Sequence, residues 1–169
     1  NLNGITEIAQ YAFSGSRLNG VNSLDLSGVT SIGKGAFSNL AGLVSVTLPA
    51  GITEIPAELF AGCTSLTSVT LPAGVTKIGA NAFKNCSSLA QVTYAGTAVK
   101  EIGASAFEGT ALTAADVPAS VEVIGDRAFA RCANLVSADI PAVKKMGQMV
   151  FAYCPALTTA VFGDLAEAT

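Results

Sequence analysis

The sequence contains no histidine and no tryptophan, and only 12% of its 169 residues are charged. Without histidine, neither a Ser-His nor a Cys-His nucleophile pair can form. No G-x-x-x-x-G-K-[ST] phosphate-binding loop is present. Cys63, Cys86, Cys132 and Cys154 are successively 23, 46 and 22 residues apart, so no C-x-x-C pair is available for a zinc site. We therefore expect no enzymatic activity, no cofactor and no metal site.

Long apolar runs are also missing, although 50% of the residues are hydrophobic. A membrane-spanning helix needs about 18 or more consecutive apolar residues, and the longest stretch, around 149–154, is followed at once by Pro155. The net charge is −3, without a basic cluster, which argues against binding to nucleic acid or to anionic lipid. We expect neither membrane insertion nor a nucleic-acid partner.

An internal repeat dominates what is present. Seven of the eight phenylalanines occupy one column, at spacings of 24, 23, 23, 24, 22 and 22 residues. The shared pattern is V-x-x-I-G-x-x-A-F-x-x-C-x-x-L-x-x-V-x-L-P, and its period lies in the range of about 20–29 residues of leucine-rich repeats. The anchors of the seven repeats are Phe13, Phe37, Phe60, Phe83, Phe107, Phe129 and Phe151.

Each part of the repeat predicts a local structure. Val69 and Leu71 alternate with Thr70, which indicates a short strand, and Pro72 ends it because proline cannot donate to a ladder. The G-x-x-A-F-x-x-C segment has apolar residues at helical spacing, which predicts one or two helical turns. Its glycine column holds Pro56 in one repeat, so that position needs a small residue at negative φ.

We therefore expect one leucine-rich-repeat domain over residues 1–169. Its fold class is an α/β repeat solenoid: a right-handed superhelix of seven repeats of 22–24 residues, with short helical turns and a parallel sheet of one short strand per repeat. The phenylalanines should stack into a spine. Two repeats depart from the pattern: the first has extra residues around 18–22, and the fifth is one residue short near Leu112, with Thr110 in place of cysteine. Irregular strand register is expected there.

The outward column of the strands is the candidate ligand-binding surface. In curved repeat proteins the concave sheet is the usual binding face, although threonine and serine also suit any solvated strand. Asp116 and Asp139 should be neighbours and could serve a basic partner or a calcium ion, but calcium takes about 6–8 oxygens. Exposed aromatic rings are lacking, since Tyr94 replaces an inward leucine, so glycans are less expected than proteins. The candidate residues are Asp25, Thr47, Thr70, Thr93, Asp116 and Asp139, continued by Val161, beside a second column of Ser23, Ser45, Ser68, Gln91, Ala114, Ser137 and Thr159.

The four cysteines share one column, so disulfides Cys63–Cys86 and Cys132–Cys154 are conceivable. Stacked side chains point the same way, however, and other repeats have leucine or threonine at this position. We therefore favour buried free thiols that act as small hydrophobic side chains. A charged column on another side alternates in sign through Glu54, Lys77 and Glu101, which predicts a solvated, self-neutralised surface.

The repeat resembles the BspA-like leucine-rich repeats of surface proteins from host-associated bacteria and some protists. This resemblance implies secretion or surface display, and adhesion to proteins or cells. The function expected is therefore an extracellular or cell-surface binding module that recognises a protein through the concave sheet. A structural spacer without a ligand is the alternative. The chain starts at Asn1 without a leader, so we interpret it as a processed or excised product. At its end, residues 163–169 form a small cap, the array was cut from a longer one, or the exposed edge mediates homodimerisation.

Overall fold

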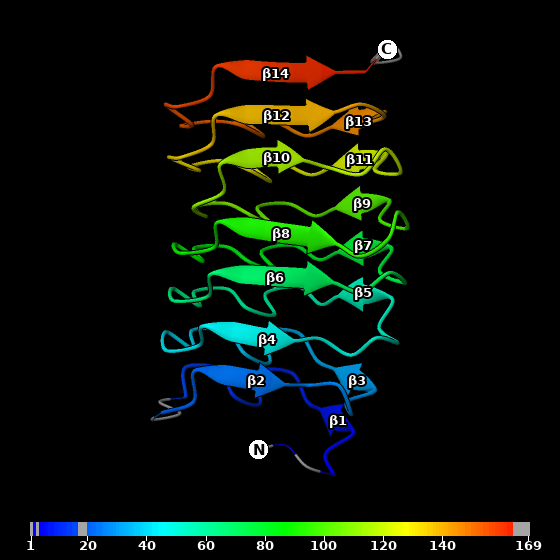
Figure 1. The fold of residues 1–169 in the computed structure, drawn as a ribbon, viewed down its shortest axis with the longest axis vertical. Coiled ribbons are helices and arrows are strands. Elements are labelled where there is room, and N and C mark those ends of the chain that lie inside the picture. Colours follow the sequence, from blue (N-terminus) through cyan, green and yellow to red (C-terminus); the bar gives the residue numbers. More distant parts are fainter. Residues whose placement is uncertain (1, 3, 17–19, 164–169) are drawn as a thin grey trace.

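The computed structural model describes residues 2, 4–16 and 20–163. The chain winds as a parallel-strand β-solenoid of about seven coils, stacked along the long axis of the molecule (Figure 1). The extra residues at 18–19 and the predicted cap at 164–169 lie outside the described residues.

Two series of strands run along the stack, one on each side (Figure 1). The first series holds the predicted strands: β2 (Ser23–Asp25), β4 (Ser45–Thr47), β6 (Ser68–Leu71), β8 (Gln91–Tyr94), β10 (Ala114–Asp116), β12 (Ser137–Ile140) and β14 (Thr159–Phe162). The second series consists of two-residue strands: β1 (Glu7–Ile8), β3 (Ser31–Ile32), β5 (Glu54–Ile55), β7 (Lys77–Ile78), β9 (Glu101–Ile102), β11 (Val123–Ile124) and β13 (Lys145–Met146). The expectation of one strand per repeat was therefore wrong, because the short charged column also pairs from repeat to repeat.

Pairing is parallel throughout, but the two series differ in continuity. The second series forms a five-stranded sheet in the order β13-β11-β9-β7-β5, with β1-β3 beside it. The first series is divided into β2-β4, β6-β8 and β10-β12-β14. The sheet predicted as a single surface is therefore three shorter ones.

The predicted phenylalanine spine is present. Neighbouring rings are stacked with centroids 5.3–5.9 Å apart along the whole series from Phe13 to Phe151. The five inner rings are buried, whereas Phe13 and Phe151 are half-buried. The leucines, isoleucines and valines of both strand series pack around this spine and form one continuous core.

The helical turns expected around the phenylalanines were wrong: no helix occurs in the part of the chain that the structure describes. Two positions in each repeat, two residues before and two residues after the phenylalanine, have positive φ angles. In the fourth repeat these are Asn81, with φ 57°, and Asn85, with φ 59°. A left-handed residue at every fourth position interrupts a right-handed helix, so the segment folds as consecutive tight turns.

Backbone hydrogen bonds explain why these turns replace a helix. The N–H of Lys84 donates to the carbonyl of Asn81 within its own repeat, over 3.1 Å. The N–H of Phe83 instead donates to the carbonyl of Ala106 in the next repeat, over 2.8 Å. Along this segment the backbone N–H groups therefore alternate: one closes a turn within its own repeat, and the next donates to the neighbouring coil. A helix would keep all of these donors inside one repeat.

The glycine column behaves as predicted. Gly103 has no positive φ, and a Cβ added to it would lie 2.7 Å from the backbone nitrogen of Ala80 in the preceding repeat. The position therefore requires a small residue because two coils approach closely there.

Candidate functional site

The candidate site is the strand face, by which we mean the outward side chains of β2, β4, β6, β8, β10, β12 and β14. Alternation along each strand places Thr47, Thr70 and Thr93 on the exposed side and Val69 and its equivalents in the core. The predicted site residues are all exposed: Asp25, Thr47, Thr70, Thr93, Asp116 and Asp139.

Strand register brings these six residues together in pairs, not in one continuous row. Asp25 is opposite Thr47, and Thr70 is opposite Thr93. Asp116 is opposite Asp139, which is followed by Val161. Each pair belongs to a separate sheet of the first series, so the structure does not join Thr93 to Asp116 through a ladder.

Two carboxylates of the strand face lack an ion-pair partner in the described part of the chain. Among the described residues, Asp116 and Asp139 make no ion pair with a lysine or arginine. Asp25 accepts a hydrogen bond from the backbone N–H of Ser27 over 3.0 Å, and this bond lowers the pKa of its carboxyl. The strand face therefore offers negative charge that the protein does not itself neutralise.

The other surfaces neutralise part of their own charge, as the alternating column predicted, although Glu54 makes no ion pair among the described residues. Lys77 lies 3.0 Å from the carboxylate of Glu101, and Lys144 lies 3.0 Å from that of Glu122. On the turn side, Glu58 pairs with Lys34 over 3.1 Å. The pKa of the Glu58 carboxyl is lowered, and the hydrogen bond from Lys34 is the largest cause of this shift.

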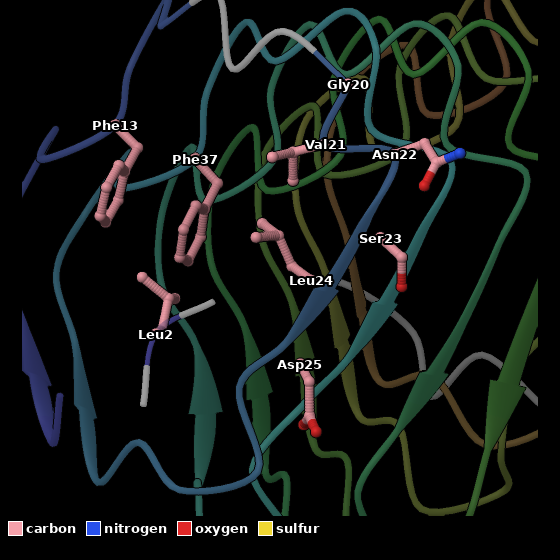
Figure 2. A pocket seen from close by; sticks show the side chains of 9 residues that line it. All are labelled: Leu2, Phe13, Gly20, Val21, Asn22, Ser23, Leu24, Asp25 and Phe37. Atoms are coloured by element: carbon pink, nitrogen blue, oxygen red, sulfur yellow. The ribbon is translucent and has the colours of Figure 1, made fainter. Parts of the chain in front are cut away.

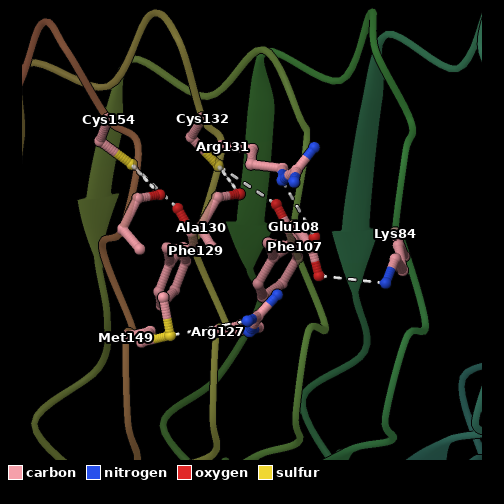
Figure 3. A network of polar contacts seen from close by, with 11 residues as sticks. Lys84, Phe107, Glu108, Arg127, Phe129, Ala130, Arg131, Cys132, Met149 and Cys154 are labelled. Atoms are coloured by element: carbon pink, nitrogen blue, oxygen red, sulfur yellow. Dashed lines mark hydrogen bonds and ion pairs between the residues drawn. The ribbon is translucent and has the colours of Figure 1, made fainter.

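A buried ion pair on the turn side escaped the sequence analysis (Figure 3). Glu108 is only 6% exposed, and its Oε2 lies 3.1 Å from Nζ of Lys84. That oxygen makes no well-aligned hydrogen bond to another described residue, and its contact with Lys84 is an ion pair. Burial alone would raise the pKa of Glu108, but a hydrogen bond from Ser105 and the charge of Lys84 outweigh it, and the net pKa is lowered. A usable signal was present, since Lys84 and Glu108 each directly follow a spine phenylalanine in adjacent repeats.

The cysteine column consists of free thiols, as we favoured. Each thiol donates to the carbonyl of the phenylalanine in the preceding repeat: Cys63 to Phe37 and Cys86 to Phe60, both over 3.1 Å. Burial raises the pKa of the Cys63 thiol to about 12. The thiols of this column therefore join neighbouring coils, and we expect the three buried ones, Cys63, Cys86 and Cys132, to be poor nucleophiles.

A cavity lies at the first coil, next to β2 (Figure 2). Its volume is about 500 Å³, and Phe13, Phe37, Leu24 and Leu2 provide its apolar walls. Among the described residues that line it, Asp25 alone is charged. This cavity exposes one end of the spine and lacks convergent polar groups, so it does not resemble a catalytic pocket.

Neither a metal site nor a membrane-spanning element emerges from the described residues. Residues 2, 4–16 and 20–163 contain no cluster of three or more metal-ligating side chains. No third described acidic, histidine or cysteine side chain therefore joins Asp116 and Asp139 to complete a calcium site. Within the same ranges, no helix has the length and apolar character to cross a membrane.

Comparison with known proteins explains the repeat. A family model described as a BspA type leucine rich repeat region, with six copies, matches residues 2–97 and 53–167. The chain belongs to the BspA-type leucine-rich repeat family. The resemblance inferred from the A-F-x-x-C-x-x-L pattern is thereby confirmed. Among curated proteins, none matches this BspA-type chain.

Solved structures of bacterial leucine-rich repeat proteins share the fold. One from Bacteroides ovatus has a TM-score of 0.84 at 25% identity, over 94% of this chain and 47% of that protein. A T. pallidum leucine-rich repeat protein, TpLRR, has a TM-score of 0.78 at 33% identity, over 90% of this chain and 72% of that one. A leucine-rich cell surface protein of Faecalibacterium prausnitzii, at 23% identity and a TM-score of 0.59, shares the fold over 95% of this chain and 65% of its own. This BspA-type chain therefore spans about half the length of the B. ovatus protein.

Proposed function

We propose that the chain is a protein-binding module that works outside the cell or on its surface, and that its strand face contacts the partner. The observation that carries this proposal is the pair of adjacent carboxylates on the strand face, Asp116 and Asp139. Glu58, Glu101 and Glu122 on the other sides are paired with lysines, whereas Asp116 and Asp139 stand in register and make no ion pair with any described residue. A partner with basic residues at its interface would supply the missing charge.

Membership of a leucine-rich repeat family supports a binding role, because such solenoids offer extended surfaces built from stacked coils. A cell-surface location is supported by the description of the F. prausnitzii relative as a cell surface protein. We propose no enzymatic activity, since the strand face carries hydroxyls and carboxylates without a nucleophile–base pair. A protein partner is favoured over a glycan because none of the six candidate residues is aromatic.

A structural spacer is the alternative, and the spine favours it. The stack of phenylalanines is unbroken from Phe13 to Phe151, which would make the array a stiff rod. In that role the chain would hold another part of a longer protein away from the surface. Charges on the strand face would then be irrelevant to activity.

Binding of the purified chain to a panel of matrix proteins, cell-surface proteins and glycans would test the proposal. The variant Thr47→Arg/Thr70→Arg/Thr93→Arg places three cations on the strand face. The matched control Thr30→Arg/Thr53→Arg/Thr76→Arg changes the same residue type in the same three repeats, at exposed positions just before β3, β5 and β7. We expect a protein ligand whose binding is lost only in the first variant. Binding that survives both variants, or no binding at all, would favour the spacer.

A further inference from the structure

The first strand series is open between β8 and β10, and one missing residue explains the opening. In five other repeats the leucine after the cysteine column closes a turn, in which its N–H donates over 2.9–3.2 Å to the carbonyl three residues earlier. Leu89 and Cys86 form this bond in the fourth repeat. The fifth repeat has Thr110-Ala111-Leu112, one residue shorter, and no such bond forms there within the described chain. Without this turn, β10 is not brought alongside β8.

The opening between β8 and β10 is wider than the spacing of two paired strands. No Cα atom of β8 lies within 8 Å of a Cα atom of β10, whereas paired strands are about 4.8 Å apart. A strand placed between two others requires twice that spacing, about 9.6 Å. The space between β8 and β10 forms a cleft of about 230 Å³, and Figure 1 shows the wider step between these two arrows.

The coils remain joined on their other sides, so the cleft is confined to the strand face. On the far side, β7 and β9 pair through Ile78 and Ile102. In the interior, the rings of Phe83 and Phe107 are stacked with centroids 5.4 Å apart. The cleft is therefore held open by a rigid frame and is preformed.

Both walls of the cleft are free strand edges. In the described part of the chain, β8 is paired only with β6, and β10 only with β12. At the strand starts, Ala90 donates to Thr67 over 3.0 Å and Val136 donates to Thr113 over 2.8 Å, but no bond links Thr113 to Ala90. Backbone donors and acceptors along these edges are free for an added strand.

The side chains of the cleft distinguish an inner from an outer side. Buried Phe107, Leu112 and Phe129 form an apolar floor. Tyr94 stands where five of the other repeats have an aliphatic residue and the seventh has Phe162. Burial raises the pKa of its phenol, which keeps the hydroxyl neutral. On the outer side the exposed carboxylate of Asp116 flanks the opening.

We propose that the cleft between β8 and β10 binds an extended peptide segment of a partner protein as an added strand. Its inward side chain is apolar and contacts Phe107, Phe129 and Tyr94. Its outward side chain is lysine or arginine and contacts Asp116, with Asp139 one strand away. This inference rests on the protein-binding function proposed above and names the part of the partner that is recognised.

A phage-displayed library of random heptapeptides, selected on the purified chain, tests this inference. The matched control is a closed variant with one glycine inserted between Ala111 and Leu112, which restores the Ala41-Gly42-Leu43 spacing of the second repeat. Closure is verified by adding Gln91→Cys and Ala114→Cys to both proteins. A disulfide between them requires Cα atoms about 4.4–6.8 Å apart, so it should form in the closed variant and not in the original chain.

The expected result is enrichment of peptides that alternate apolar and basic residues, with affinity at least tenfold lower for the closed variant. N-methylation of the bound peptide backbone should also weaken binding, because added-strand recognition uses backbone N–H groups. No enrichment, or equal affinity for the original and closed proteins, would overturn the inference. The protein ligand identified from the panel could also bind the closed variant normally and fail to bind only the Thr47→Arg/Thr70→Arg/Thr93→Arg variant. In that case the proposed function stands, and the cleft is not the binding site.

Discussion

The thiol of Cys63 donates a hydrogen bond to the backbone carbonyl of Phe37, 3.1 Å away in the preceding repeat. Cys132 and Phe107 form the same contact over 3.2 Å. One cysteine side chain thus fills the space beneath the spine and satisfies a carbonyl in the neighbouring coil. This dual role explains why the column holds cysteine without forming disulfides.

Thiol reactivity should therefore be very low in the folded protein. The thiolate is the nucleophile, and with a Cys63 pKa of about 12 only about one thiol in 10⁴ is ionised at pH 8. We expect no labelling of Cys63 or Cys86 by a disulfide reagent at pH 8, and labelling of all four cysteines after denaturation. Cys154, which is only half-buried, should react first. Rapid labelling of Cys63 in the native protein would contradict the buried contact.

Alkaline pH should destabilise the fold through the same thiols. Burial raises the Cys63 pKa from 9.0 to about 12, so above pH 9 the unfolded chain releases a proton that the native state retains. Stability is therefore complete below pH 9 and is lost as pH rises toward 12, by about 1.4 kcal/mol per pH unit for each such thiol. Urea unfolding at several values between pH 8 and 11 measures this slope. In the variant Cys63→Ala, the free energy of unfolding should fall less steeply with pH, by about 1.4 kcal/mol per pH unit. An unchanged slope would refute the raised pKa of Cys63.

The sequence pattern predicted the repeat length, the spine, the exposed strand residues and the free thiols, because each depends on a column of equivalent positions that can be compared between repeats. It failed at the segment around the phenylalanines, where the apolar spacing also fits a helix. The missed signal was the column two residues after each phenylalanine, which contains Gly15, Asn39, Gly62, Asn85 and Gly109. Glycine and asparagine are the residues that most readily adopt positive φ.

Other features depend on contacts between repeats that no single column reveals. The irregularity at Leu112 was visible in the sequence, but the width of the resulting opening depends on how the second strand series holds the coils together. The short strands of that series were read only as a charged column, because two residues are too few for an alternating pattern to be recognised.

The turn geometry can be distinguished from a helix by one substitution. Met149 has a φ of 56° and is 47% exposed. Replacing it with glycine should stabilise the protein by about 1 kcal/mol relative to Met149→Ala, because glycine adopts positive φ without steric cost. In a helix the order would be reversed, with glycine about 1 kcal/mol less stable than alanine. Both variants lose the contact between the Met149 sulfur and Arg127, so chemical denaturation of this pair isolates the backbone effect.

Acid should weaken the ion pair at Glu108. The carboxyl has a pKa below 4.5 in the folded protein, so its contribution to stability is present above that value and is lost as pH falls through the folded pKa. We expect Glu108→Gln to cost about 1–2 kcal/mol at pH 7 and to reduce the loss of stability between pH 5 and 3. Thermal melting at pH 7, 5, 4 and 3 compares the two proteins. Parallel curves would show that the Lys84 contact does not stabilise the native state.

The rings of the phenylalanine spine should contribute differently to stability according to their position along the array. Phe83 is fully buried between Phe60 and Phe107, with ring centroids 5.7 and 5.4 Å away. Phe151 is half-buried and is stacked on Phe129 at 5.7 Å. Removing an inner ring leaves a cavity between two coils, so Phe83→Ala should lower the free energy of unfolding by about 3–5 kcal/mol. Phe151→Ala should cost less, because solvent already reaches that ring and the neighbouring chain can collapse onto the site. Guanidinium unfolding measures both, with Phe83→Leu as the control that keeps most of the volume. Equal losses for the two alanine variants would show that the spine does not stabilise the array through its buried stacking.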